Sequence, residues 1–219
     1  MAKIKEIFTS VQGEGPLVGY KQLFIRFCGC NLSCKYCDTD FSQIGAKEYS
    51  SEELAHICNQ HSDCHSVSLT GGEPLLNVEF LKDFLPNVTL PVYIETNGTL
   101  ATELCEVIDY IQYIAADIKL PSVTGLKPLW SEHEEFLKLC RGKEVFAKVV
   151  FDENITEYEI CKTAMLCKKY DVELILQPKM DGQNLTVSSD FIQSTLDKFL
   201  EYYTRVRVIP QTHKFLNIE

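Results

Sequence analysis

The segment KQLFIRFCGCNLSCKYC, from Lys21 to Cys37, joins an apolar run to a group of closely spaced cysteines. Its first part, Lys21–Phe27, has the length and composition of a buried β-strand. Cys30, Cys34 and Cys37 follow, with three and two residues between them. Because these thiols lie so close along the chain, they can surround one metal centre. The segment therefore predicts a metal-binding loop directly after a strand.

The same order of strand and helix recurs along the rest of the chain. Short apolar and β-branched runs predict strands at Lys21–Phe27, Ser66–Leu69, Pro91–Glu95, Tyr113–Ile118, Glu144–Phe151, Asp171–Leu176 and Arg205–Ile209. Apolar residues at helical spacing predict helices at Ser50–Cys58, Val78–Leu85, Ala101–Tyr110, Ser131–Cys140, Ile155–Tyr170 and Ser188–Tyr203. Ser50 and Glu53 fit a capping box at the start of the first helix.

A repeated strand-then-helix order implies parallel strands joined by right-handed crossovers. We therefore expect an α/β fold with an incomplete, TIM-like barrel of about six to seven parallel strands, or an open sheet. A complete eightfold barrel would be tight for a chain of 219 residues. No linker or repeat divides the chain, so residues 1–219 are expected to form a single domain.

Composition and charge exclude several classes of protein. The chain is 45% hydrophobic and 24% charged, as is usual for soluble globular proteins. Its net charge of −10 argues against a nucleic-acid partner. It has no signal peptide and no apolar run of transmembrane length, which predicts a cytoplasmic protein without a membrane partner. In that reducing compartment, the ten cysteines should be thiols or metal ligands.

Polar residues gather where the predicted strands end. In parallel α/β folds, these ends share one face, and that face carries the active site. The segments concerned are Cys30, Thr70–Pro74, Glu95–Gly98, Asp117 with Lys119, Gln177–Lys179 and Pro210–His213.

The spacing of the cysteines indicates the kind of metal centre. Three thiolates suit a [4Fe–4S] cluster that leaves one iron open, whereas structural zinc prefers four ligands. No second pair of cysteines and no pair of histidines with zinc-finger spacing follows. A set of Cys28, Cys34 and Cys37 is an alternative to Cys30, Cys34 and Cys37, but Cys28 continues the strand pattern and should be packed.

These motifs resemble those of radical S-adenosylmethionine enzymes. The cysteine spacing in the loop after the first strand is the signature of that superfamily, and Gly71-Gly72-Glu73-Pro74 is similar to its GGE segment. Finer features resemble the 7-carboxy-7-deazaguanine synthases. They are Gln12–Gly15, Arg26, Cys37-Asp38-Thr39, Glu95–Gly98 and Pro210–Lys214.

This resemblance implies a fold, a reaction and partners. The fold would be the partial barrel of the radical SAM type. The reaction would contract the ring of 6-carboxy-5,6,7,8-tetrahydropterin to give 7-carboxy-7-deazaguanine, a precursor of queuosine, with loss of ammonia. The partners would be the small pterin, an electron donor such as flavodoxin or ferredoxin, and a second copy of the chain in a homodimer.

The resemblance also implies roles for individual residues. Cys30, Cys34 and Cys37 would hold the [4Fe–4S] cluster, and Thr39 would bind Mg²⁺ through its hydroxyl. S-adenosylmethionine would meet Tyr36, Cys37, Asp38, Gly72, Glu73, Asp117, Ile118, Lys119, Gln177, Pro178, Lys179 and Met180. The family often has Ser-Pro-Lys where this chain has Asp117-Ile118-Lys119. The substrate would meet Val11, Gln12, Gly13, Glu14, Arg26, Thr70 and His213.

Simpler interpretations compete at some of these positions. Arg26 could be exposed on an edge strand, Thr39 could cap a turn, and Lys119 could form only a local ion pair with Asp117. The group His61, Asp63, Cys64 and His65 is expected to be a solvated helix end. Cys58, Cys105, Cys140, Cys161 and Cys167 should pack in the core, and His56 and His133 should be exposed.

Two other functions remain open from the sequence. A glycyl-radical-enzyme activase would share the cysteine triplet, but this function would not explain the presence of Gln12–Gly15 and Arg26. A zinc-stabilised or iron–sulfur electron-transfer module is the alternative outside enzyme chemistry.

Overall fold

Nine strands form one curved sheet in the computed structural model, which describes residues 1–37 and 39–218. Their order is β11-β8-β7-β6-β5-β4-β2-β1-β3. Seven of them are parallel, which confirms the predicted α/β class. They are β2 (Lys21–Phe27), β4 (Ser66–Gly71), β5 (Val92–Thr96), β6 (Tyr113–Asp117), β7 (Glu144–Phe151), β8 (Glu173–Pro178) and β11 (Val206–Val208). Among the described strands, β11 and β3 are the two edges, so strand pairing does not close the barrel.

Two antiparallel strands that the sequence pattern did not predict extend the sheet beyond β2. They are β1 (Ala2–Val11) and β3 (Lys47–Tyr49). The register of β1 against β2 shifts between Ile4 and Glu6. Because such a bulge interrupts the alternation of apolar and polar residues, β1 lacks the regular strand pattern. β9 (Met180–Asp181) and β10 (Asn184–Leu185) form a separate short hairpin, and the turn that joins them contains Gly182.

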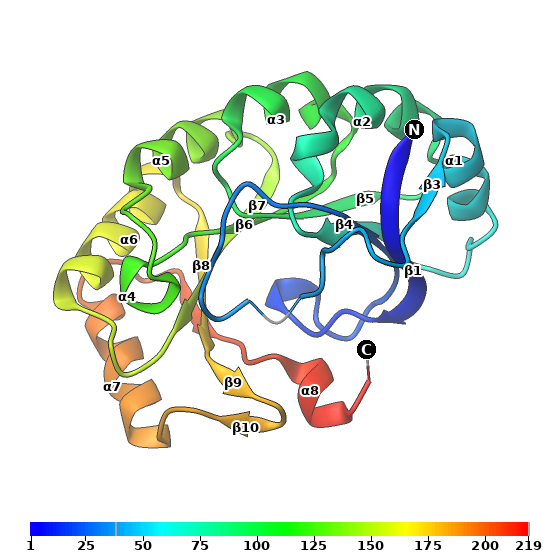
Figure 1. Cartoon of the computed structure of the whole chain (residues 1–219). Helices are drawn as coiled ribbons and strands as arrows, with labels where there is room; N and C mark the ends of the chain where they lie inside the picture. The colour runs from blue at the N-terminus through cyan, green and yellow to red at the C-terminus, as the bar shows by residue number, and fades with distance from the viewer. Residues whose placement is uncertain (38, 219) are drawn as a thin grey trace.

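The helices cover the outer side of the curved sheet. Figure 1 shows α1, α2, α3, α5, α6 and α7 in an arc along this side, with α8 and the C-terminus on the other. The bounds are α1 (Ser51–Asn59), α2 (Val78–Phe84), α3 (Ala101–Val107), α4 (Pro121–Thr124), α5 (Trp130–Leu139), α6 (Glu157–Tyr170), α7 (Ser189–Leu200) and α8 (Thr212–Leu216). Short 3-10 turns are Gly15–Leu17, Pro74–Asn77, Leu85–Asn87 and Ile108–Tyr110. The capping box of Ser50 and Glu53 is confirmed, whereas the single turns α4 and α8 were not predicted.

Side chains alternate along each strand between the helices and the inner face of the sheet. Leu69, Ile94 and Leu176 belong to the large apolar core under the helices. A smaller inner cluster of Tyr93, Ala115, Phe146 and Ile175 fills the inner face toward the strand starts. Nearer the carboxyl ends, most inner positions are polar instead, and the polar ones are Arg26, Thr70, Glu95, Asp117, Lys148 and Gln177. The inner face of the sheet is therefore apolar toward the strand starts and mostly polar toward the carboxyl ends.

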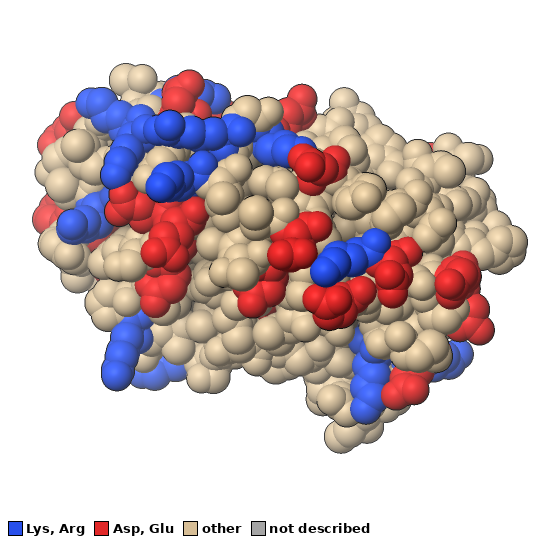
Figure 2. All heavy atoms as spheres, turned by 90° about the horizontal axis from the view of Figure 1, so that it is seen from above, with Lys and Arg blue, Asp and Glu red and all other residues tan. Residues whose placement is uncertain are grey.

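The outer surface carries mixed charge. On the face shown in Figure 2, acidic and basic side chains lie among each other. Among the described residues, no helix has both the length and the apolar composition needed to cross a membrane.

The cysteines outside the predicted cluster differ in their burial. All ten cysteines are free thiols. Cys58, Cys140 and Cys167 are buried in the core, as predicted. The prediction was wrong for Cys105, which is exposed, because it lies on the side of the short helix α3 that faces away from the sheet core.

A close approach of two backbones joins the GGE segment to the cysteine loop. The Gly72 N–H donates to the Phe27 carbonyl (3.1 Å), and the Glu73 N–H donates to the Gly29 carbonyl (2.9 Å). A Cβ on Gly72 would lie 1.8 Å from the Gly29 oxygen, so only glycine fits there. The contact fixes the end of β4 beside the first cysteine of the cluster loop.

His133 on α5 joins two further loops at the same edge. It is 2% exposed, so the prediction of an exposed side chain was wrong. Its Nε2 accepts from the Lys119 backbone N–H (3.1 Å), and its Nδ1 lies 3.1 Å from the Gly98 carbonyl. These contacts require a neutral ring with the proton on Nδ1. Burial lowers the pKa of His133 from 6.5 to about 4.

We predict that Gly72→Ala destabilises the fold and prevents cluster assembly, because the new methyl group must push the Gly29 backbone away. Thermal unfolding and the iron content after anaerobic reconstitution measure the two effects. Gly142→Ala is the control, since a Cβ there meets nothing within 4 Å although its φ is +80°. That variant should show only a backbone cost of about 1 kcal/mol and should retain iron. A Gly72→Ala protein with a normal melting temperature and full iron content would contradict the packing argument.

We predict that His133 makes the protein less stable as the pH falls. Its pKa is below the ordinary value, so the unfolded chain takes up the proton first, and stability is lost as the pH falls from 6.5 to about 4. Between about pH 7.5 and about pH 5, wild type should lose about 2 kcal/mol more unfolding free energy than His133→Gln. Urea unfolding of both proteins at the two pH values measures this difference. A difference that does not change with pH would show that His133 is not held neutral.

Candidate active site

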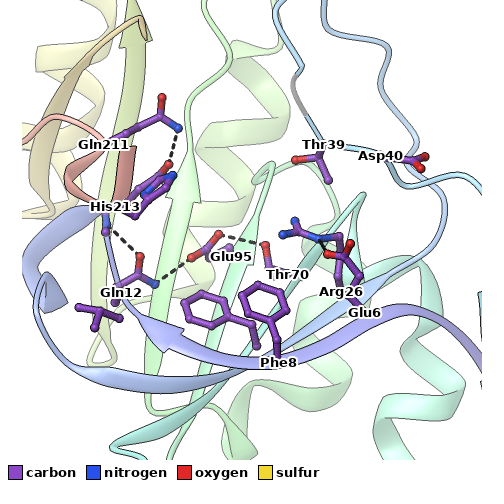
Figure 3. Close-up of a pocket in the computed structure, with 14 residues that line it drawn as sticks. Glu6, Phe8, Gln12, Arg26, Thr39, Asp40, Thr70, Glu95, Gln211 and His213 are labelled. Carbon is purple, nitrogen blue, oxygen red and sulfur yellow. Dashed lines mark hydrogen bonds and ion pairs between the residues drawn. The ribbon is translucent and has the colours of Figure 1, made fainter. Parts of the chain in front are cut away.

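A cavity of about 460 Å³ opens on the inner face at the carboxyl ends of the strands. Its volume lies in the range of small-molecule binding sites. The structure brings the whole predicted substrate set to its wall, from β1 and the loop after it, β2, β4 and the C-terminal segment (Figure 3). This set is Val11, Gln12, Gly13, Glu14, Arg26, Thr70 and His213.

Glu95 is the central carboxyl group of this cavity, and the sequence prediction did not assign it a role. Its Oε1 accepts from Gln12 Nε2 (3.0 Å), and its Oε2 accepts from Thr70 Oγ1 (3.0 Å), as the dashed lines in Figure 3 show. Gln12 also donates to Gln22 Oε1 (2.9 Å) behind the wall. Burial raises the pKa of Glu95, and the neighbouring Lys148 opposes that shift. The chain of bonds fixes the orientation of the carboxyl group.

Arg26 lies in the cavity wall and not on an exposed edge, because β2 pairs with β1 on one side and with β4 on the other. Its Nε donates to Glu6 Oε2 (2.8 Å), and its guanidinium lies 5.7 Å from the centre of the Phe8 ring. Phe8 stacks on Phe24, with 5.2 Å between the ring centres. The sequence prediction missed Glu6, Phe8 and Phe24, since all three depend on the pairing of β1 with β2.

A second cavity adjoins the first and contains the three cysteines. Cys30, Cys34 and Cys37 all line it, together with the predicted residues Tyr36, Thr39, Gly72, Asp117, Lys119 and Gln177. The two cavities share a wall of five residues, which are Glu14, Thr39, Thr70, Glu95 and Gln211. A molecule in one cavity would therefore lie next to a molecule in the other.

The donor set of the second cavity fits an iron–sulfur cluster. The Leu32 N–H (3.4 Å) and Asn97 Nδ2 (3.9 Å) donate to Cys30 Sγ, as they would to a cluster thiolate. Burial raises the pKa of the Cys30 and Cys34 thiols, and the Lys119 ammonium opposes that shift. Cys28 is half-buried outside this cavity, and its Sγ donates to the Ser42 carbonyl (3.4 Å). The geometry thus favours Cys30 over Cys28 as the first ligand.

The sulfurs of Cys30, Cys34 and Cys37 do not all lie within 4.8 Å of one another. Among the described residues, one group of three His, Cys, Asp or Glu side chains has all its ligand atoms within 4.8 Å of one another, and it is His61, Asp63 and Cys64. The three cysteines resemble a cluster site by their sequence spacing and by the cavity that they share. The His61 group lies after α1, away from both cavities, and Asp63 forms an ion pair there with Lys21.

Some predicted cofactor residues are not in the wall of this cavity. Glu73 is fully buried, and its carboxylate accepts from the Leu75 N–H (3.1 Å), Thr96 Oγ1 (2.9 Å) and the Asn97 N–H (2.7 Å). Burial raises the pKa of Glu73 to about 7. Ile118 belongs to the core under the helices, and Lys179 pairs with Asp152. Pro178 and Met180 are also outside the wall, and Asp38 lies outside the described residues.

Asp117 and Lys119 form more than a local pair. Lys119 Nζ lies 2.7 Å from Asp117 Oδ2 and donates to Tyr36 Oη (3.4 Å), so it joins the strand end to the cysteine loop. Burial alone would lower the pKa of Lys119, but Asp117 and Tyr36 outweigh it and raise the pKa well above its ordinary value. Lys119 therefore carries a positive charge beside the cysteines.

Comparisons with known proteins agree with this geometry. Residues 24–150 match the model of the Radical SAM superfamily. The chain is 36% identical to a 7-carboxy-7-deazaguanine synthase of Geobacter sulfurreducens, over 98% of this chain and 97% of the relative. It is 32% identical to an Archaeoglobus fulgidus protein of the same name, over 99% of both chains. The crystal structure of QueE from Escherichia coli has the same fold, with a TM-score of 0.67 and 22% identity over 97% of this chain and 94% of that one.

The family model covers the strand, the cysteine loop and the GGE segment, and the relatives extend the match to the whole chain. The family implies a [4Fe–4S] cluster and S-adenosylmethionine, which the second cavity fits. The chain therefore belongs to the 7-carboxy-7-deazaguanine synthase family of the Radical SAM superfamily.

Proposed function

We propose that this chain converts 6-carboxy-5,6,7,8-tetrahydropterin to 7-carboxy-7-deazaguanine with loss of ammonia. The observation that carries the proposal is the shared wall between the two cavities. On one side lie the predicted substrate residues, and on the other lie the three cysteines. Such contact is what a reaction between a bound radical source and a small substrate requires.

The chemistry of the larger cavity suits a carboxylated pterin. The terminal nitrogens of Arg26 present two parallel donors for the substrate carboxylate. Glu95 presents oriented acceptors for the amino group and ring N–H of the pterin, and the Gln12 amide lies beside it. Phe8 and Phe24 supply an apolar surface for a flat ring.

The smaller cavity would hold the cofactors. Cys30, Cys34 and Cys37 would ligate the cluster, and the Gly72 backbone with Asp117, Lys119 and Gln177 would surround S-adenosylmethionine. With the reduced cluster, that cofactor would supply the radical chemistry needed to remove a hydrogen atom from the substrate. The protein's contribution is to orient the two molecules and to limit the access of water. Glu73 orders the loop that follows β5, since it accepts from both Thr96 and Asn97.

Thr39 is the proposed site of Mg²⁺. It lies in the wall shared by both cavities, so an ion on its hydroxyl would also reach the substrate carboxylate. Mg²⁺ commonly takes few protein ligands and completes its shell with water and substrate. The remaining partners carried over from the family are a flavodoxin or ferredoxin as electron donor and a second copy of the chain as a homodimer.

The function is tested by anaerobic incubation of the reconstituted protein with the carboxytetrahydropterin, S-adenosylmethionine, Mg²⁺ and a strong reductant. We expect deazaguanine product, detected by mass spectrometry, and about four irons per chain. Cys34→Ala should abolish the product, whereas Cys28→Ala should retain both cluster and turnover. Bound zinc without cofactor cleavage would support a zinc module instead, and a full cluster without product would refute the proposal.

Arg26→Gln should mainly weaken substrate binding, because it removes the paired donors for the carboxylate. A hydrogen bond to a charged group contributes about 1.5–3 kcal/mol, so KM for the pterin should rise by roughly 10- to 100-fold. Arg207→Gln is the control. Arg207 lies on the edge strand β11, outside both cavities, and forms an ion pair with Glu173 of β8. Steady-state kinetics with varied pterin measure the effect. If Arg26→Gln lowered kcat while KM stayed unchanged, the carboxylate would not bind at this position.

A further inference from the structure

Lys148 is a buried cation that lines the smaller cavity, and the predicted substrate and cofactor sets assign it no role. It lies on β7 and is 7% exposed. Its Nζ forms an ion pair with Glu14 Oε2, and it lies 3.3 Å from Asp117 Oδ1. Glu14 comes from the loop after β1, and Asp117 ends β6. Lys148 therefore joins Glu14, in the wall that the two cavities share, to Asp117, which lines the smaller cavity.

Each of these carboxylates is held by a second contact besides Lys148. Glu14 Oε1 accepts from Gln211 Nε2 (2.8 Å), in the C-terminal segment that also carries His213. Asp117 Oδ2 pairs with Lys119 (2.7 Å), which contacts Tyr36 of the cysteine loop. The result is a continuous chain of polar contacts. It runs from Gln211 through Glu14, Lys148, Asp117 and Lys119 to Tyr36.

The charges around Lys148 explain why this one cation can hold both Glu14 and Asp117 in place. Glu14 and Asp117 act on each other as like charges, and Glu95 adds a third carboxyl group near Lys148. Without the ammonium, these groups would be left buried next to one another, and a buried charge that loses its partner moves or takes up a proton. Glu14 and Asp117 would then leave the positions that face the two cavities.

We propose that Lys148 is a positioning residue that holds Glu14 toward the pterin and Asp117 toward S-adenosylmethionine, and so links the two binding sites. The inference rests on the proposed function, since it takes the identity of both ligands from it. Lys148 would act through the two carboxylates that it holds in place. A purely structural ion pair would support the fold without changing the affinity of either ligand.

Direct binding tests this inference without turnover. Lys148→Met removes the charge and keeps the length of the side chain. The probes are 6-carboxypterin, a fluorescent oxidised analogue of the substrate, and S-adenosylmethionine on the reconstituted protein, measured by equilibrium dialysis. We expect both dissociation constants to rise by about tenfold or more. Lys143→Met is the matched control just before the start of β7, outside both cavities, and should bind both probes as wild type does.

A double-mutant cycle shows whether Lys148 acts through Glu14. Glu14→Gln should weaken 6-carboxypterin binding in the wild-type background and have a smaller effect in the Lys148→Met background. Independent effects that simply add would overturn the proposed route. If Lys148→Met alone does not fold, the charge-balanced pair Glu14→Gln with Lys148→Met replaces it. That pair should still bind S-adenosylmethionine about tenfold more weakly, and wild-type affinity would overturn the proposal.

The outcomes separate this inference from the proposed function. Lys148→Met with a lower melting temperature and both affinities unchanged would overturn the positioning role while wild type still binds both ligands. Wild-type protein that binds no 6-carboxypterin would refute the proposed function itself.

Discussion

The site depends on one constraint, the parallel alignment of seven strands with a fixed alternation of side chains. Parallel pairing places every carboxyl end at the same edge of the sheet. The alternation then turns one set of side chains toward the helices and the other toward the inner face. Leu69 and Thr70 illustrate this division, since the first packs under the helices and the second donates to Glu95. Neighbouring residues of the same strand therefore contribute alternately to the apolar core and to the walls of the cavities.

The alignment also sets the electrostatics of the site. Glu14, Lys148, Asp117 and Lys119 are each contributed by a strand or by the loop that directly follows one, and their formal charges sum to zero. Removing such groups from water is costly unless they are paired, and a hydrophobic packing would be at least as stable. A buried alternating row of charges beside two open cavities is therefore better explained by ligand binding than by stability. The shared wall makes the row a physical connection between the cavities.

Much of this arrangement could be predicted from the sequence, because local patterns determine it. The strand Lys21–Phe27 was predicted with its observed bounds, and the cysteine spacing located the second cavity. The irregular strand β1 was missed because its bulge breaks the alternation. The burial of His133 depends on loops far away in the sequence, so no local pattern could show it. Glu95 and Lys148 could have been found, since each is a charged residue that follows apolar residues within a mostly apolar strand.

In the proposed function, the pterin and S-adenosylmethionine occupy adjoining cavities on either side of the shared wall. The most direct measurement is an anaerobic crystal structure of the reconstituted protein with both ligands bound. We expect the pterin carboxylate within hydrogen-bond distance of Arg26 and the pterin ring edge at Glu95. We expect the methionyl group of the cofactor beside the cluster on Cys30, Cys34 and Cys37. A pterin bound outside the Arg26 cavity, or a cofactor separated from it by ordered protein, would refute this arrangement of the two ligands.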